Sequence, residues 1–155
     1  REDPRVRVVV VSEGMGADWL KEKKDELGLE NLMILGFQPF EVLPDVLGSA
    51  DVLTAILEPD AGVFSVPSKV LTYLCAGRAL LLAVPEENLA ARIVSRNDAG
   101  VVVDPLDTEG FVAAAQALLD DPAKRERYAG NARAYAERTF DIEAITDKFV
   151  KVLTF

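Results

Sequence analysis

Residues 58–77, EPDAGVFSVPSKVLTYLCAG, carry the chain's clearest potential for chemistry, because their residue types suit the binding of a charged ligand. Two prolines, acids, a glycine and serines predict a loop, and a short apolar helix that ends at Gly77 follows. Pro67 suits the start of that helix, and Ser65 or Ser68 could cap it through a side-chain oxygen. The unpaired N–H groups and the dipole of a helix start attract anions, so this stretch predicts an anion site.

Lys69 adds a positive charge to the first turn of the predicted helix. A cation is mildly unfavourable at that position because it meets the positive end of the helix dipole. Its presence therefore indicates an external anion, and phosphate is the anion that we expect. The same residues also fit an ordinary loop with a solvated lysine, so the stretch alone leaves both interpretations open.

The bulk composition limits the classes of protein to consider. A length of 155 residues fits one domain, and 50% hydrophobic with 28% charged residues is typical of a soluble globular protein. A net charge of −9 argues against nucleic acids and anionic membrane surfaces as partners, although it allows one local phosphate pocket. The chain has no histidine, which removes the usual general base and the commonest metal ligand. We therefore expect no metal and no cofactor.

Cys75 is the single cysteine, so the chain cannot form an internal disulfide. Its place in an apolar helix favours a small buried side chain over a nucleophile. No apolar run approaches the ~20 residues that cross a membrane, and no signal peptide is visible, so we expect a cytoplasmic protein. The chain begins with Arg1 rather than methionine, and we expect it to be a piece of a longer protein.

Short apolar segments alternate with helical patterns along the whole chain. The strands expected span 6–11, 32–35, 51–57, 79–84 and 99–104. The helices expected span 17–27, 41–47, 68–76, 88–95, 108–119, 122–140 and 141–153. We expect Asp18 to cap the first helix, Gly28 to end it, and Pro44 to interrupt the second. The pattern predicts an α/β fold with a doubly wound parallel sheet, helices on both faces and the C-terminal helices packed on one side.

Three turns with potential ligand-binding groups each follow a predicted strand. Gly14 follows the first strand, Phe37-Gln38 follows the second, and 58–69 follows the third. Ligands of open parallel sheets bind beyond the carboxyl ends of the strands. We therefore expect these turns to lie along one edge and to share one ligand.

The order of these elements resembles a known family. Its motifs are Gly14-Met15-Gly16, Leu27-Gly28, Gly36-Phe37-Gln38-Pro39, Leu43-Pro44, Ala50-Asp51-Val52 and the run VPSKVLTYLCAGRALL. Together they resemble the donor-binding, C-terminal half of retaining GT-B-fold glycosyltransferases of group 1, similar to family 4. The resemblance covers nearly the whole chain and implies one Rossmann-like domain over 1–155. It implies transfer of a sugar from a UDP- or GDP-sugar to an acceptor, without a metal.

The resemblance also implies a role for each matched residue. Lys69 would be catalytic, and the donor diphosphate would be held by Gly14, Ser65, Val66, Pro67, Ser68 and Lys69. Thr72 would face the ribose, and Phe37 and Gln38 would frame the base. Glu58 and Asp60 would approach the sugar.

Two departures from the family pattern change what we expect. A pair of glutamates common in the family aligns to Phe64 and Thr72, which implies a weaker grip on the ribose. The family's first strand and helix, and the acceptor domain before them, have no counterpart here. We therefore expect nucleotide binding without turnover, a missing N-terminal domain as partner, and a peripheral membrane location through that domain. An open sheet edge should also promote self-association.

Three alternatives remain open from the sequence. A nucleotide-sugar epimerase of similar architecture is disfavoured by the absence of histidine. A non-catalytic α/β binding module is favoured somewhat by the substituted glutamate positions. A flavodoxin-like receiver domain needs a cluster of acids after its first strand, and Glu13 alone does not supply one.

Overall fold

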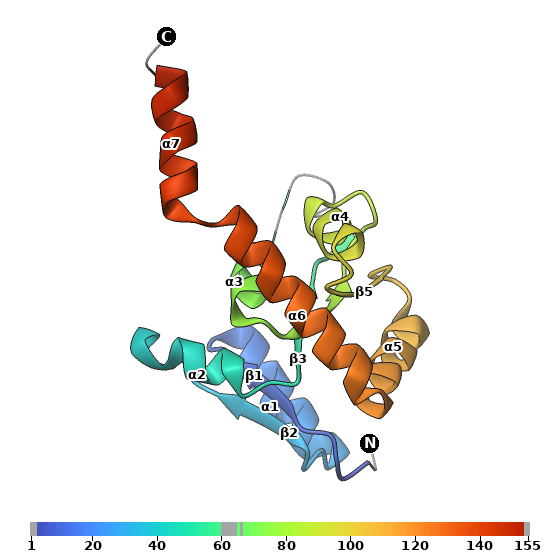
Figure 1. Cartoon of the computed structure of the whole chain (residues 1–155). Helices are drawn as coiled ribbons and strands as arrows, with labels where there is room; N and C mark the ends of the chain where they lie inside the picture. Colours follow the sequence, from blue (N-terminus) through green and yellow to red (C-terminus); the bar gives the residue numbers. More distant parts are fainter. Residues whose placement is uncertain (1–2, 60–64, 66, 154–155) are drawn as a thin grey trace. The chain divides into compact units, whose positions relative to one another are not determined.

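The structure, a computed structural model, describes residues 3–59, 65 and 67–153, in which strands and helices alternate (Figure 1). The strands are β1 (Val8–Val11), β2 (Leu32–Leu35), β3 (Val52–Ile56), β4 (Ala79–Ala83) and β5 (Gly100–Val103). The helices are α1 (Met15–Leu27), α2 (Leu43–Gly48), α3 (Lys69–Ala76), α4 (Leu89–Arg96), α5 (Thr108–Asp120), α6 (Pro122–Thr139) and α7 (Ile142–Leu153). A 3-10 turn, η1 (Phe40–Val42), precedes α2.

The chain falls into two compact units, Arg1–Asp45 and Val46–Phe155. In the first unit β1 pairs in parallel with β2, and Val8 lies opposite Leu32. In the second unit the strand order is β3-β4-β5, and all pairs are parallel. The parallel α/β class is therefore confirmed, with a small sheet in each unit. That all 155 residues form one domain stays a prediction.

The central strand β4 shows why the larger sheet is covered on both faces. Leu80 and Leu82 pack into a cluster with side chains of α3, α4 and the second half of α6. The alternate residues Ala79 and Leu81 pack with Leu118 of α5 and Tyr128 near the start of α6. Successive side chains of a strand point to opposite faces, so an uninterrupted apolar strand requires helices on both sides. This arrangement confirms the doubly wound pattern.

Left-handed glycines end two of the helices, as expected. Gly28 (φ 59°) follows α1 and Gly77 (φ 61°) follows α3, and both adopt a backbone conformation that side chains with a Cβ disfavour. The expected cap at Asp18 is wrong. The helix starts three residues earlier at Met15, with Gly14 at the cap position, and Asp18 falls within its first turn. An acid there still suits the helix dipole.

Pro44 lies in the first turn of a helix rather than interrupting one. It is the second residue of α2, whose first residue is Leu43. A proline is tolerated there because its missing N–H has no partner in the first turn of a helix. The segment before it forms the separate 3-10 turn η1. The single interrupted helix expected over 41–47 is therefore corrected to a 3-10 turn followed by a short α-helix.

Helix α7 differs from the expected packing of the C-terminal helices. None of its residues is buried, and Figure 1 shows it extending away from the helices of its own unit. Large apolar side chains on it are more than half exposed, namely Ile142, Phe149, Val150, Val152 and Leu153. Within the described residues, no helix is both long and apolar enough to cross a membrane. The cytoplasmic location expected from the sequence stays a prediction.

Candidate functional site

The candidate site lies at the carboxyl edge of the three-stranded sheet. Ile56 is paired with Ala83, which is paired with Val103, so the three parallel strands end together. Glu58 and the segment from Ser65 to Lys69 follow β3 and lead into α3. This is the edge where open parallel sheets bind their ligands.

The start of α3 has no side-chain cap. Ser68 occupies the cap position with helical backbone angles (φ −54°, ψ −30°) and makes no cap hydrogen bond. A capping serine normally needs extended angles to aim its oxygen back at the helix, so the expected cap by Ser68 is wrong. Ser65 also makes no side-chain bond to α3 within the described residues.

Two amide groups at the start of α3 have no acceptor among the described residues. The N–H of Val70 donates to Pro67 O at 2.9 Å, and that of Leu71 donates to Ser68 O at 3.1 Å. The N–H groups of Ser68 and Lys69 make no backbone hydrogen bond within the described part of the chain. Free N–H groups at the positive end of a helix favour an anionic ligand.

Helix α3 separates anchoring side chains from exposed ones. Val70 and Leu74 are fully buried in the core of the second unit. Lys69, Thr72 and Cys75 are exposed, and their spacing of three residues places them along one side of the helix. Lys69 makes no ion pair within the described residues, so its ammonium group is available to a ligand. The expected burial of Cys75 is wrong, because this position lies on the exposed side.

The environment of Tyr73 in α3 shifts the pKa of its hydroxyl group. It is half-buried against the core cluster of the second unit. Burial penalises the charged phenolate and raises the pKa of Tyr73 from its ordinary value of 10.0. Tyr73 therefore stays neutral near pH 7 and contributes packing rather than charge.

Some predicted site residues lie outside the described part of the chain, and another is described but is exposed to solvent. Asp60 and Val66 lie outside the described residues, as does Phe64, which aligns to a family glutamate. Glu58 is described and is exposed after β3. Its proposed contact with a sugar stays a prediction.

Asn88 contacts the segment that leads into α3, and our sequence interpretation did not single it out. It caps α4, and its side-chain Nδ2 donates to the backbone oxygen of Ser65 at 2.8 Å. It follows β4 at the same carboxyl edge as Ser65. An asparagine at the start of a predicted helix is a usual sign of a cap, and this signal could have identified Asn88 as the cap of α4.

The remaining predicted residues belong to the first unit. Gly14 (φ 86°) precedes α1, and a Cβ there would meet no atom within 4 Å. Phe37 is 70% exposed, and its N–H donates to Glu13 Oε1 at 2.9 Å. The Gln38 side chain donates to Gly36 O at 2.9 Å. The turns after β1 and β2 therefore meet, although the Phe37 amide already has an acceptor and would not be free for a base.

Gly14, Phe37 and Gln38 belong to one unit, whereas Lys69 and Thr72 belong to the other. Each unit is described by itself. That the two sets share one ligand stays a prediction, as do the roles assigned to phosphate, base and ribose.

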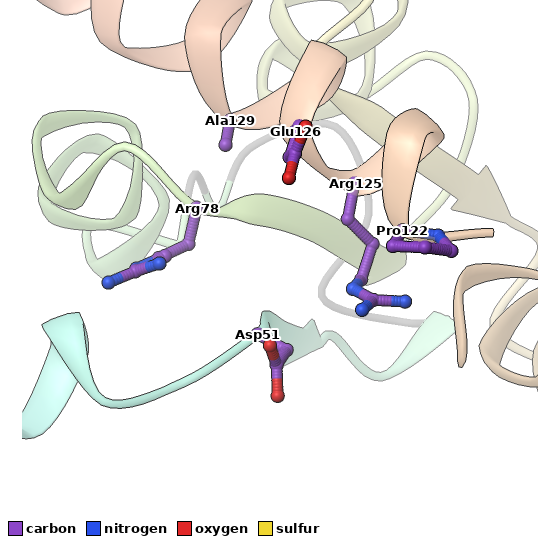
Figure 2. A pocket seen from close by; sticks show the side chains of 6 residues that line it. All are labelled: Asp51, Arg78, Pro122, Arg125, Glu126 and Ala129. Carbon is purple, nitrogen blue, oxygen red and sulfur yellow. The ribbon is translucent and has the colours of Figure 1, made fainter. Parts of the chain in front are cut away.

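A hollow of about 170 Å³ lies at the opposite edge of the larger sheet (Figure 2). Its arginines already bind helix ends: Arg78 donates to Gly48 O, and Arg125 donates to Leu118 O and Leu119 O at 2.5 and 2.9 Å. Asp51 supplies an opposite charge between them. These arginines cap the C-terminal ends of α2 and α5, which gives the hollow a structural role.

Within the described ranges, no group of three or more acidic or cysteine side chains could hold a metal ion. The groups that could attract an anion at the start of α3 are two amides and one ammonium group. That the chain works without a metal stays a prediction.

A family model and a curated relative both match this chain, and both are described as glycosyl transferases. The model of "Glycosyl transferases group 1" matches residues 1–121. A curated relative, the putative colanic acid biosynthesis glycosyl transferase WcaI of Escherichia coli (strain K12), is 27% identical over 151 residues, which cover 97% of this chain and 36% of WcaI.

Solved structures match the fold. HepE (Alr3699) of Anabaena in complex with UDP superposes with a TM-score of 0.79 at 20% identity, over 98% of this chain and 42% of HepE. A HepE complex with UDP-glucose gives the same values. WaaG, a glycosyltransferase involved in lipopolysaccharide biosynthesis, has a TM-score of 0.70 at 21% identity, over 96% of this chain and 38% of WaaG. The chain thus spans about two fifths of the length of these relatives.

Proposed function

Because this chain belongs to the group 1 glycosyl transferases, we propose that it is the donor-binding part of an enzyme that moves a sugar from a nucleotide-diphosphate sugar to an acceptor. The observation that carries the proposal is the open start of α3. It combines the N–H groups of Ser68 and Lys69, which have no acceptor in the described part of the chain, with the exposed Lys69 side chain at the carboxyl edge of a parallel sheet.

These groups suit the chemistry of the departing nucleotide. When the bond between the sugar and the β-phosphate breaks, its electron pair stays on the diphosphate, where negative charge grows. Fixed amide donors and a lysine stabilise such charge because they need little reorganisation as the reaction proceeds. Lys69 would contact the β-phosphate, and Thr72, one turn further along α3, would hydrogen-bond the ribose.

The acceptor would be bound and activated by a region that is present in the longer relatives and unmatched here. We therefore expect these 155 residues to bind nucleotide without transferring sugar. UDP is the first nucleotide to test, since the similar HepE was crystallised with UDP and UDP-glucose. GDP remains the alternative.

The experiment is isothermal titration calorimetry of the folded chain with UDP and with GDP. Lys69→Ala should weaken binding of the preferred nucleotide by at least about tenfold, because a charge-assisted contact to phosphate is lost. Lys148→Ala, which removes an exposed lysine from α7, is the matched control and should leave affinity unchanged.

Absence of heat with both nucleotides, in a sample whose circular dichroism shows a folded α/β protein, would contradict the proposal. A non-catalytic binding module is the alternative function. It predicts that Lys69→Ala leaves partner binding intact and that neither nucleotide binds.

A further inference from the structure

Asn88 has an environment unlike that of the other polar residues described. It is fully buried, and it is the one buried polar or charged residue found among the described residues. Burying an amide is costly unless both its oxygen and its NH2 group find hydrogen-bond partners. The partners of this side chain therefore indicate why the residue is there.

The two ends of the Asn88 side chain bind different segments. Its Oδ1 accepts from the N–H of Ala90 at 2.9 Å, which caps α4. Its Nδ2 donates to the backbone oxygen of Ser65 at 2.8 Å, across 23 positions of sequence. The orientation of the amide follows from these partners, since an N–H needs an acceptor and a carbonyl needs a donor.

Capping alone does not require asparagine at this position. Serine, threonine and aspartate cap helices about as well, because each offers an acceptor oxygen. Of these residue types, only asparagine also offers an N–H donor in the same planar group, whereas ionised aspartate has none. The bond to Ser65 is therefore one role that an amide side chain can fill at this position and a carboxylate cannot.

The bond joins the segments that follow β3 and β4 at the carboxyl edge. Ser65 precedes Pro67, Ser68 and Lys69, and Pro67 O accepts the Val70 N–H in the first turn of α3. The bond to Ser65 is partly buried, and it anchors the backbone at Ser65, shortly before Pro67 in the sequence. An anchor at that point reduces the ordering that a bound anion must impose at the start of α3.

We propose that Asn88 is a positioning residue for the nucleotide diphosphate. It fixes the Ser65 carbonyl, an anchor that precedes Pro67 and Ser68 in the sequence, and it does not itself contact the ligand. This inference rests on the proposed function and adds to it a residue that holds the site from the neighbouring strand.

Asn88→Asp tests the proposal with the least change in shape. The carboxylate keeps the acceptor for Ala90 N and therefore the cap, but it replaces the donor to Ser65 O with a second acceptor. The affinity for UDP or GDP, whichever the wild-type chain binds, should fall about tenfold by calorimetry, as expected for the loss of one partly buried hydrogen bond. Hydrogen exchange of the Val70 and Leu71 amides should become faster.

Asp121→Ala is the matched control. Asp121 caps α6 through its bond to Lys124 N at 2.9 Å, so this change removes a helix cap elsewhere in the same unit. It should lower the unfolding temperature while leaving both nucleotide affinity and exchange at Val70 and Leu71 unchanged. Asn88→Ser, which also keeps a cap oxygen, should behave like Asn88→Asp.

The outcomes separate this inference from the function on which it rests. If the wild-type chain binds neither nucleotide, the proposed function fails, and exchange at Val70 and Leu71 still decides whether Asn88 fixes the segment. If Asn88→Asp folds and its exchange and affinity match the wild type, the positioning role is overturned. The same holds if Asn88→Asp lowers only the unfolding temperature, because the bond to Ser65 O would then support stability without positioning the start of α3.

Discussion

The side chains of α3 divide their tasks by their position around the helix. Val70 and Leu74 are buried in the core, and the residues that would contact a ligand, Lys69 and Thr72, lie on the exposed side. A change at Lys69 therefore removes charge without disturbing packing. This separation makes Lys69→Ala a measurement of binding rather than of folding.

Tyr73, between those two sides, should make stability depend on pH. Burial raises its pKa in the folded state, so above pH 10.0 the unfolded chain releases this proton more readily than the folded chain. The free energy of unfolding should therefore fall as the pH rises through that region. Urea unfolding from about pH 8 to about pH 11, followed by circular dichroism, measures this dependence.

The variant Tyr73→Phe isolates this contribution, because it keeps the ring and removes the titrating hydroxyl. Its free energy of unfolding should decrease less steeply with pH than that of the wild type. Parallel curves for the two proteins would show that the Tyr73 hydroxyl ionises equally easily in both states.

At the residue scale, local patterns predicted Lys69 in the first turn of a helix after a strand. They could not predict the bonds from Asn88 to Ser65 or from Phe37 to Glu13, which cross 23 and 24 positions. Such partners are decided by which strands become neighbours, and no local period in the sequence encodes that. Cys75 was misjudged because apolar neighbours on a helix do not reveal which side an individual position takes.

At the scale of the elements, pairing of β4 with β5 depends on Gly100. A Cβ on Gly100 would lie 2.1 Å from the backbone oxygen of Leu80, its paired residue. Because that oxygen belongs to the central strand, it cannot move without disturbing the sheet. Gly100→Ala should therefore lower the free energy of unfolding by about 3 kcal/mol, measured by urea denaturation.

Gly130→Ala provides the opposite control within the same unit. Gly130 lies inside α6, and a Cβ there would meet no atom within 4 Å. Alanine forms helix better than glycine, so this variant should gain about 0.5–1 kcal/mol. Equal stability of the two variants would contradict the close approach of Gly100 to β4.

The elements themselves were largely predictable, because Val, Leu and Ala runs mark strands buried on both faces. The range 32–35 expected for a strand matches β2, and the ranges expected for the other strands contain the observed ones. The errors in the predicted elements mostly concern the residues at which helices start. Gly14 occupies the cap position of α1 that Asp18 was expected to occupy, because both residue types suit a cap and the choice depends on the preceding turn.

At the scale of the whole molecule, the chain should self-associate as its concentration rises. Strand β3 is an outer strand of the larger sheet among the described residues, and an outer strand can pair with another chain. Ile56 on this strand is 64% exposed. Sedimentation velocity or light scattering should show an average mass that grows with protein concentration.

Two variants locate the surface that is responsible. Ile56→Lys places a charge on the outer strand and should return the chain to a monomer, because lysine discourages edge pairing. Phe149→Glu is the control, because the Phe149 side chain of α7 is 65% exposed and that of Ile56 is 64% exposed. This variant should leave self-association unchanged. A monomeric wild type at high concentration, or a monomer produced by Phe149→Glu alone, would contradict pairing through β3.

The exposure of Cys75 has a practical consequence. It is the sole thiol in the chain and it lies on the side of α3 that carries Lys69 and Thr72. A maleimide fluorophore can therefore be attached at one defined position, with no engineered cysteine and none to remove. Its emission would report, in solution and in real time, on changes at the very helix from which the ligand-binding proposals start.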